Sequence, residues 1–333
     1  MVTPTFADYV DLLFTLFERF WQHHSARPHQ GHPFVYAHKA LLVFFLVMQQ
    51  RRIFRFKAQR RWLVQHPERR QAFGLNDVPD RTTLSRRYKA LYAVLQDFIA
   101  FLGTYAEDLD TRFTSTDLYT DKSLFKAQGP VWHQSDRQAG HIPAKLRHLD
   151  TDGSWSKSGY HGWVYGYGLH LVDNGIGFPK LAQVETAAVS EKVVLDQQAE
   201  PLLNGFHPAT VTTDDSYTQA RRIRQWAKRG VLLLTPALRW TTGRYAIAYR
   251  GYIRQPEQSE LLRRRRTAIE PLFDLVAQAL GATGLQKQLP MQHLDNVRTC
   301  LLLATLTVQV AMVANSIWGL PLRNISTLAT AFT

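Results

Sequence analysis

Three acidic residues occur where the sequence could support metal-dependent chemistry on phosphodiesters. Asp117 lies in a segment rich in β-branched and aromatic residues, Asp214 follows a short apolar segment, and Glu270 comes after four successive arginines. Cleavage or transfer of a phosphodiester needs an activated nucleophilic oxygen and a stabilised leaving oxygen, and two divalent cations about 3.5–4 Å apart provide both. Because Mg²⁺ binds oxygen ligands and keeps several waters, a few carboxylates from separate elements can hold it. The three acids are therefore candidate metal ligands.

Each acid also has a structural interpretation. Asp117 could lie at a strand edge and face water, although a charge inside a sheet is costly unless it is paired or bound to metal. Asp214 or Asp215 could cap the helix that follows them. Glu270 comes three residues after Thr267, which is the spacing of a capping box. Considered singly, only Asp117 favours the catalytic interpretation.

The charge balance predicts a polyanionic partner. The 333 residues include 40 Lys and Arg against 27 Asp and Glu, which gives a formal net charge of +13. A folded basic protein attracts nucleic acid, whereas no lipidation motif or basic amphipathic tail indicates a membrane partner. The one cysteine, Cys300, excludes a disulfide framework and a cysteine-based zinc site within the chain. We therefore expect a soluble cytoplasmic protein that binds DNA.

Two domains are expected from the pattern of apolar residues. Residues 1–105 are predicted to be helical throughout, because apolar residues recur at helical spacing over 6–21 and 40–48. Residues 106–333 are predicted to form an α/β domain with helices at its C-terminal end. Within it, residues 301–313 are apolar but shorter than a bilayer requires, which predicts a buried helix.

The first domain contains a candidate helix–turn–helix. After a turn at residues 74–79, the run 80–89 predicts a helix that Asp80 or Thr82 caps. In a helix–turn–helix this element would bring Thr83, Arg86 and Arg87 to base edges and phosphates in the major groove. The alternative is an amphipathic bundle helix whose arginines face water.

From about residue 110 the sequence predicts alternating strands and helices. Strands are expected over 112–119, 163–172, 178–188, 209–213 and 231–234, and helices over 190–203, 217–229 and from 257 onward. Ser190 is the expected N-cap of the first helix, and Gly230 follows the second at a position typical of helix ends. This order predicts a mixed sheet with helices packed on it, preceded by the all-α N-terminal domain.

Taken together, these motifs resemble the DDE transposases of bacterial insertion sequences, in the insertion-sequence-four/five-like group, which have an RNase H-like catalytic core. The rule that the second acid precedes a tyrosine by three residues selects Asp214 over Asp215. The segments that carry the resemblance are residues 79–87, Thr116-Asp117, residues 162–172, Asp214 with Tyr217, and Arg266-Thr-Ala-Ile-Glu270 with Phe273.

The chain also departs from the family pattern. Relatives often have a tyrosine three residues before the motif arginine and a lysine seven residues after the glutamate, whereas this chain has Arg263 and Ala277 there. Arg263 can still bind a phosphate, and Lys287 is a candidate to replace the missing lysine. The 56-residue step from Asp214 to Glu270 leaves no room for the large β insertion of some relatives.

The resemblance implies a transposase that binds the ends of its element, cleaves them and transfers their 3′-hydroxyls to target DNA. Asp117, Asp214 and Glu270 would hold two Mg²⁺ ions, for which Mn²⁺ can substitute, and Arg263 and Arg266 would neutralise phosphates of double-stranded DNA. Because two ends of the element must be held together, we expect the protein to bind DNA as a dimer. We expect it in the bacterial cytoplasm, associated with the nucleoid. The alternatives are a catalytically decayed DNA-binding regulator and an RNase H-fold nuclease that cuts without joining.

Overall fold

The chain folds into two compact units. The computed structural model describes residues 4–24, 35–159, 162–237, 242–284 and 287–326. A helical unit comprises residues 1–102 and 275–333, and an α/β unit comprises residues 103–274. Helices α6 (Tyr92–Leu109) and α11 (Pro256–Leu280) pass from one unit into the other.

The helical unit is built around apolar helices, and the predicted helices at 6–21 and 40–48 are confirmed. Besides parts of α6 and α11, the unit consists of α1 (Phe6–His23), α2 (His38–Gln50), α3 (Phe56–Gln65), α4 (Pro67–Ala72), α5 (Arg81–Lys89) and α12 (Leu294–Ile317). A capping box starts α1, because the Thr5 hydroxyl accepts from the Asp8 amide and the Asp8 carboxylate accepts from the Thr5 amide. The centre of α2 is buried on all sides, as a core helix requires.

Helix α12 is the long apolar helix that the sequence predicts to be buried. Among the described residues it alone is long and apolar enough to cross a membrane, but 89% of its most apolar window is buried inside the protein. Several of its polar side chains bond to other helices: the Thr299 hydroxyl donates to the Tyr88 carbonyl, and the Gln309 amide donates to the Ile99 carbonyl. The buried helix predicted over 301–313 is therefore confirmed.

The compact units differ from the predicted domains at the C-terminal end. The sequence assigned all residues after 105 to the second domain, whereas α12 packs against α2 and α5 in the helical unit. A helix that is apolar on every side needs partners around its whole circumference, and the N-terminal helices supply them.

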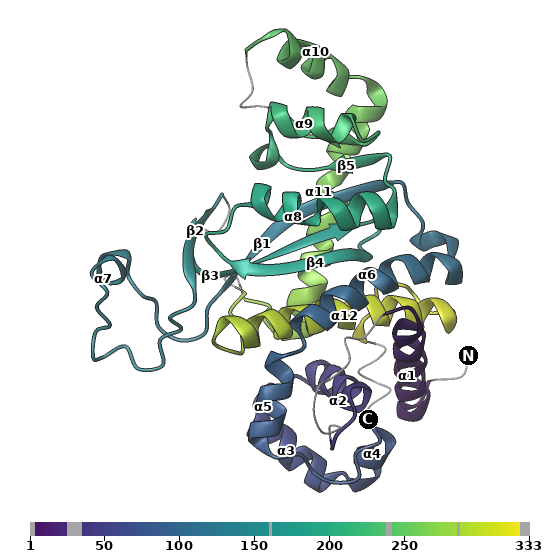
Figure 1. Cartoon of the computed structure of the whole chain (residues 1–333), viewed down its shortest axis with the longest axis vertical. Coiled ribbons are helices and arrows are strands. Elements are labelled where there is room, and N and C mark those ends of the chain that lie inside the picture. The colour runs from purple at the N-terminus through teal and green to yellow at the C-terminus, as the bar shows by residue number, and fades with distance from the viewer. Residues whose placement is uncertain (1–3, 25–34, 160–161, 238–241, 285–286, 327–333) are drawn as a thin grey trace. The chain divides into compact units, whose positions relative to one another are not determined.

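The α/β unit contains a six-stranded mixed sheet (Figure 1). Strand β1 pairs antiparallel with β3 and parallel with β5, β5 pairs parallel with β6, and β3 also pairs with β2 and β4. Its elements are η1 (Thr111–Phe113), β1 (Asp117–Lys126), α7 (Gln134–Gln138), β2 (Ser154–Ser158), β3 (Gly162–Asp173), β4 (Pro179–Thr186), α8 (Glu191–Pro201), η2 (Leu202–Phe206), β5 (Thr210–Thr212), η3 (Asp215–Tyr217), α9 (Ala220–Ala227), β6 (Leu232–Leu234), α10 (Arg244–Ile253) and most of α11. The predicted fold class, a mixed sheet flanked by helices after an all-α region, is confirmed.

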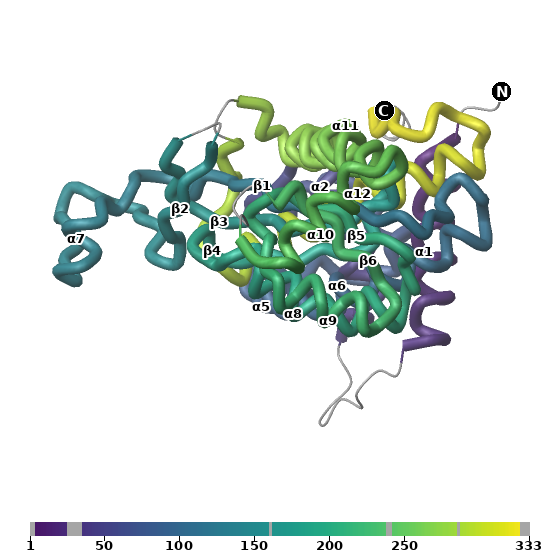
Figure 2. Tube along the Cα trace, turned by 90° about the horizontal axis from the view of Figure 1, so that it is seen from above, coloured from purple at the N-terminus to yellow at the C-terminus, as the bar shows by residue number. Residues whose placement is uncertain are grey.

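Helices cover both faces of this sheet. Figure 2 shows α11 on one side of the sheet and α8 and α9 on the other. Successive side chains of β1 point to opposite faces. Asp121 accordingly contacts Arg265 of α11, whereas the Lys122 ammonium donates to the carbonyls of Ala187 and Val189 in the turn before α8.

Several element boundaries follow the prediction, and one differs in a way that matters for the site. Ser190 caps α8 by accepting from the Lys192 amide, and Gly230 has a φ of +79° after α9, as expected. Strand β1, predicted over 112–119, instead begins at Asp117 and continues to Lys126. Pairing with β3 from Tyr119 onward extends the strand, and η1 occupies the residues before it. Helix α10 and strand β2 were not predicted.

Candidate active site

Two carboxylates meet at the edge of the sheet where β5 ends. In the parallel pair of β1 and β5, Tyr119 lies opposite Thr212. Asp121 and Asp214 each follow two residues later, and the negative charge of Asp214 acts on Asp121. Residues at equal steps beyond a paired position on two parallel strands lie level with each other, so these two acids are neighbours although β1 continues to Lys126.

The Asp121 carboxylate lies between the sheet and α11. Its Oδ2 accepts from Arg265 Nη1 at 2.5 Å, its Oδ1 accepts from the Lys122 amide at 2.8 Å, and the side chain is 19% exposed. Burial raises the pKa of Asp121 to about 6, although Arg265 opposes the shift, and the charge of Asp214 raises it further. A largely buried acid of this kind, next to a second acid, is typical of functional sites.

Asp214 is held by the backbone that follows it. Its Oδ1 accepts from the Ser216 amide at 2.8 Å and from the Ser216 hydroxyl at 2.5 Å, so it caps the short helix η3. Asp215 instead accepts from the Thr218 hydroxyl. Asp214 therefore caps η3 and not the longer helix predicted over 217–229, which begins at Ala220. Its second carboxylate oxygen, Oδ2, lies outside these two bonds.

Asp117 lies at the other end of the strand pair, which corrects its predicted place beside Asp214. It is the first residue of β1, lies opposite Thr210, and accepts from the Thr210 hydroxyl at 2.6 Å. Asp214 is four residues further along the neighbouring strand, which is about 13 Å at the usual strand rise. That separation makes Asp121, which lies level with Asp214, the better placed of the two acids to share with Asp214 a pair of cations about 3.5–4 Å apart. Asp117 instead ties the start of β1 to β5.

Asp121 is the acid that our sequence interpretation missed. The signal that could have identified it is the continuation of strand-forming residues Leu124 and Phe125 beyond Asp121, which places that acid inside the strand. Ending the predicted strand at Tyr119 left Asp121 in an apparent loop. The pairing of β1 with β5 is what shows which acid of this strand is level with Asp214.

Glu270 lies in the middle of α11, five residues beyond Arg265. The capping-box interpretation is wrong, because α11 starts at Pro256 and the Thr267 hydroxyl donates to the Arg264 carbonyl within the helix. The Glu270 side chain is 59% exposed, and its Oε1 is 3.9 Å from Arg266 Nε. Five residues correspond to about 7.5 Å along a helix axis, so Glu270 lies about that distance along α11 from the arginine that contacts Asp121.

The chemistry of these donors fits a hard divalent cation. Asp121, Asp214 and Glu270 offer carboxylate oxygens alone, which are the ligands that Mg²⁺ and Mn²⁺ prefer. Burial makes the charge of Asp121 costly, and a cation would stabilise that charge. The residues present therefore suit a divalent metal.

The arginines of α11 and Lys287 have different surroundings. Arg263 donates to the Glu260 carboxylate on the protein surface, and Arg266 is exposed apart from its long contact with Glu270. Lys287 belongs to the helical unit, where its φ is +43°. The DNA contacts of all three stay predictions.

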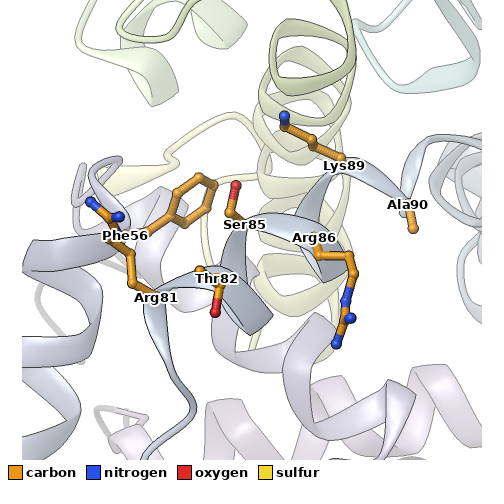
Figure 3. Close-up of a pocket in the computed structure, with 7 residues that line it drawn as sticks. All are labelled: Phe56, Arg81, Thr82, Ser85, Arg86, Lys89 and Ala90. Atoms are coloured by element: carbon orange, nitrogen blue, oxygen red, sulfur yellow. The ribbon is translucent and has the colours of Figure 1, made fainter.

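The exposed face of α5 differs from the predicted one. Leu84, Arg87 and Tyr88 form its inward side, so Arg87 is only 7% exposed, and Thr83 is half-buried. The outward side lines a groove of about 680 Å³ with Phe56 of α3 beside it (Figure 3). Of the three residues of α5 predicted to contact DNA, Arg86 alone is exposed. The other outward-facing side chains in the groove are Arg81, Thr82, Ser85 and Lys89.

Comparison with known proteins identifies one family. Residues 115–286, about half of the chain, match the family model described as Transposase DDE domain. The matched residues contain β1, β5 and the whole of α11, and with them Asp117, Asp121, Asp214 and Glu270. No curated protein and no solved structure matches the chain.

Proposed function

This chain belongs to the transposase family with the DDE domain, and from that premise we propose that it binds the ends of an insertion sequence, cleaves them and joins their 3′-hydroxyls to target DNA. The observation that carries this proposal is the pair of carboxylates, Asp121 and Asp214, at one edge of the sheet. The family, the helical N-terminal region and the mixed sheet are together consistent with an RNase H-like DDE core. The Arg266-x-x-x-Glu270 motif supports the insertion-sequence-four/five-like group.

We assign the acids as Asp121, Asp214 and Glu270, with Asp117 as a positioning residue. Divalent cations, Mg²⁺ or Mn²⁺, supply the Lewis acidity that generates a nucleophilic oxygen and stabilises the leaving one. Asp121 and Asp214 would hold them from the sheet edge, and Glu270 would contribute from α11. The bonds from Ser216 fix the orientation of the Asp214 carboxylate, and the bond between Thr210 and Asp117 keeps β1 and β5 in register.

The partner is double-stranded DNA, both the ends of the element and the target. Arg86 and its neighbours on the outward face of α5 suit contacts with DNA, and Arg263 and Arg266 of α11 suit phosphates near the acids. Two ends must be held together for transfer, so we propose a dimer on DNA, acting at the nucleoid in the bacterial cytoplasm.

The decisive experiment compares Asp121→Asn with Asp117→Asn. A linear duplex carrying the DNA that flanks the gene is incubated with each protein, with Mg²⁺ or with EDTA, and nicked and joined products are separated on denaturing gels. We expect Asp121→Asn, Asp214→Asn and Glu270→Gln to lose metal-dependent cleavage, because each removes a ligand charge. Asp117→Asn should keep most of the activity.

Each result has a defined meaning. Loss of activity in Asp117→Asn with activity kept in Asp121→Asn would overturn the acid assignment. Binding of the ends without any metal-dependent nicking by the wild type would instead identify a decayed DNA-binding regulator. Efficient cleavage without joined products would identify a nuclease of the same fold.

A further inference from the structure

Most of the net positive charge of the chain is concentrated between Asp214 and Glu270. Residues 218–266 contain thirteen Lys and Arg but only two acids, so these 49 residues account for 11 of the 13 net positive charges. Such a concentration in a segment bounded by two of the proposed acids marks a surface for a polyanion.

Part of this charge is neutralised within the unit, and part faces solvent. Arg222 pairs with Asp196 and Arg229 pairs with Glu200. By contrast, Arg221 and Arg224 of α9 and its C-cap residue Lys228 are exposed, and they lie along one side, because positions three and seven residues apart share a side of a helix.

An exposed aromatic side chain lies beside these cations. Tyr245 of α10 is 39% exposed. The guanidinium carbon of Arg224 lies 5.4 Å from the centroid of the Tyr245 ring, so α9 and α10 present one mixed basic and aromatic surface, which we call the α9–α10 surface. Arg244 extends it at the start of α10.

Hydrogen bonds fix this surface beside the acidic edge of the sheet. The Tyr249 hydroxyl of α10 donates to the Leu233 carbonyl at 2.8 Å and accepts from the Thr235 amide at 2.9 Å. The Thr235 hydroxyl also bonds the hydroxyl of Thr218, four residues after Asp214. Helix α10 is thus anchored at the end of β6, next to the end of β5 that leads into Asp214.

We propose that the α9–α10 surface binds the DNA strand that flanks the phosphate being cleaved. Arg221, Arg224 and Lys228 contact its backbone phosphates, and the Tyr245 ring stacks on an unpaired base. Regularly spaced cations next to an exposed aromatic ring suit a nucleic-acid strand, because the cations follow the phosphates and every base has a face for stacking. This inference rests on the proposed function, because it takes DNA as the partner of the acidic site.

The phosphate contacts can be tested by the salt dependence of binding. The full-length protein is titrated in EDTA against a fluorescein-labelled duplex with a single-stranded overhang, taken from the flanking DNA, and Kd is measured by anisotropy at several salt concentrations. The triple variant Arg221→Gln, Arg224→Gln and Lys228→Gln should reduce the slope of log affinity against log salt by roughly 0.9 for each phosphate that the protein no longer neutralises. A control variant, Lys39→Gln with Arg112→Gln and Arg229→Gln, removes three cations that already pair with acids and should keep the slope.

The stacking contact has its own test. Tyr245→Ala should weaken binding to the overhang duplex by roughly tenfold, and to a blunt duplex much less, whereas Tyr245→Phe should bind as the wild type does. Equal slopes for the two triple variants, together with wild-type binding by Tyr245→Ala, would overturn the proposal. A change in sedimentation with those variants would then identify the surface as a contact between copies of the chain. These binding experiments are made in EDTA, which prevents cleavage, so a negative result for the α9–α10 surface does not affect the cleavage test of Asp121. If the wild-type protein binds no DNA at all, the proposed function itself is rejected.

Discussion

At the residue scale, the site depends on how one buried acid is stabilised. The ion pair with Arg265 offsets part of the cost of burying the Asp121 carboxylate, yet the pKa of Asp121 is still raised to about 6 by burial. The same carboxylate is the one that we assign to a cation. Arg265 and a metal would therefore compete for one group, and metal binding there would require the arginine to move or to share its partner.

Removing Arg265 should strengthen metal binding. In Arg265→Gln the carboxylate is released from its ion pair, so the affinity for Mn²⁺ at pH 8 should rise by roughly tenfold, the equivalent of one charge-assisted hydrogen bond. Isothermal calorimetry of the DNA-free protein measures this directly. Arg264→Gln removes an equal charge from the next position of the helix and should change the affinity far less. Equal or weaker binding by Arg265→Gln would show that the arginine supports the cation site.

His170 makes the stability depend on pH. Burial, with the nearby charge of Lys122, lowers the pKa of His170 to about 3, well below the value near 6.5 of the unfolded chain. Between these values the unfolded state takes up a proton that the folded state does not, so stability is full above pH 6.5 and is lost as the pH falls. From pH 7 to pH 5 the wild type should lose about 2 kcal/mol more than His170→Gln in urea unfolding. Parallel losses in the two proteins would contradict this assignment.

At the scale of elements, the pairing of β1 with its two neighbours positions the acids. The parallel register with β5 brings Asp121 level with Asp214, and the antiparallel pairing with β3 keeps β1 extended past Asp121. The close approach of β1 to β3 depends on Gly166, where an added Cβ would lie 2.0 Å from the Phe125 carbonyl oxygen. A side chain at that position cannot be accommodated without a shift of the backbone.

Gly166→Ala should therefore destabilise the α/β unit. The methyl group would meet backbone atoms of Phe125 and Ala127, which cannot move as a side chain can, so we expect a loss of roughly 1–3 kcal/mol in the free energy of unfolding. Urea denaturation measures the loss. Gly159→Ala is the matched control, because open space surrounds its Cβ position. A Gly166→Ala protein as stable as this control would show that the two strands can separate without cost.

At the scale of the whole molecule, the two ends of the chain fold together. Helix α12 is buried along nearly all of its length and packs against α1, α2 and α5, which come from the start of the chain. The α/β unit lies between these segments in sequence, so the helical unit is complete only when the last helix has been made.

A buried charge in α12 should therefore unfold the N-terminal helices. Leu303→Asp places an unpaired carboxylate in the core, which should cost roughly 4 kcal/mol or more. Limited proteolysis with mass spectrometry should then show cuts within α1 to α5 that the wild type resists. Ile317→Asp, at the half-exposed end of the same helix, should remain resistant. Resistance of both proteins would mean that the N-terminal helices do not need α12.

The sequence alone determined those features that depend on local patterns. Apolar spacing located α1 and α2, a continuous apolar run located α12, and alternation located β3, while Ser190 marked the start of α8 and Gly230 the end of α9. The motifs around Asp214 and Glu270 identified the family, because they lie within short stretches of chain.

Tertiary structure alone decided which residues face one another. The choice between Asp117 and Asp121 depends on the register of β1 with β5, whose partners are about 93 residues apart in sequence, and no local pattern encodes that register. The burial of Arg87 likewise depends on which face of α5 packs inward, and the assignment of α12 to the helical unit depends on contacts across most of the chain. Local propensities act within a few residues, whereas pairing and packing are set by which distant surfaces can bury one another.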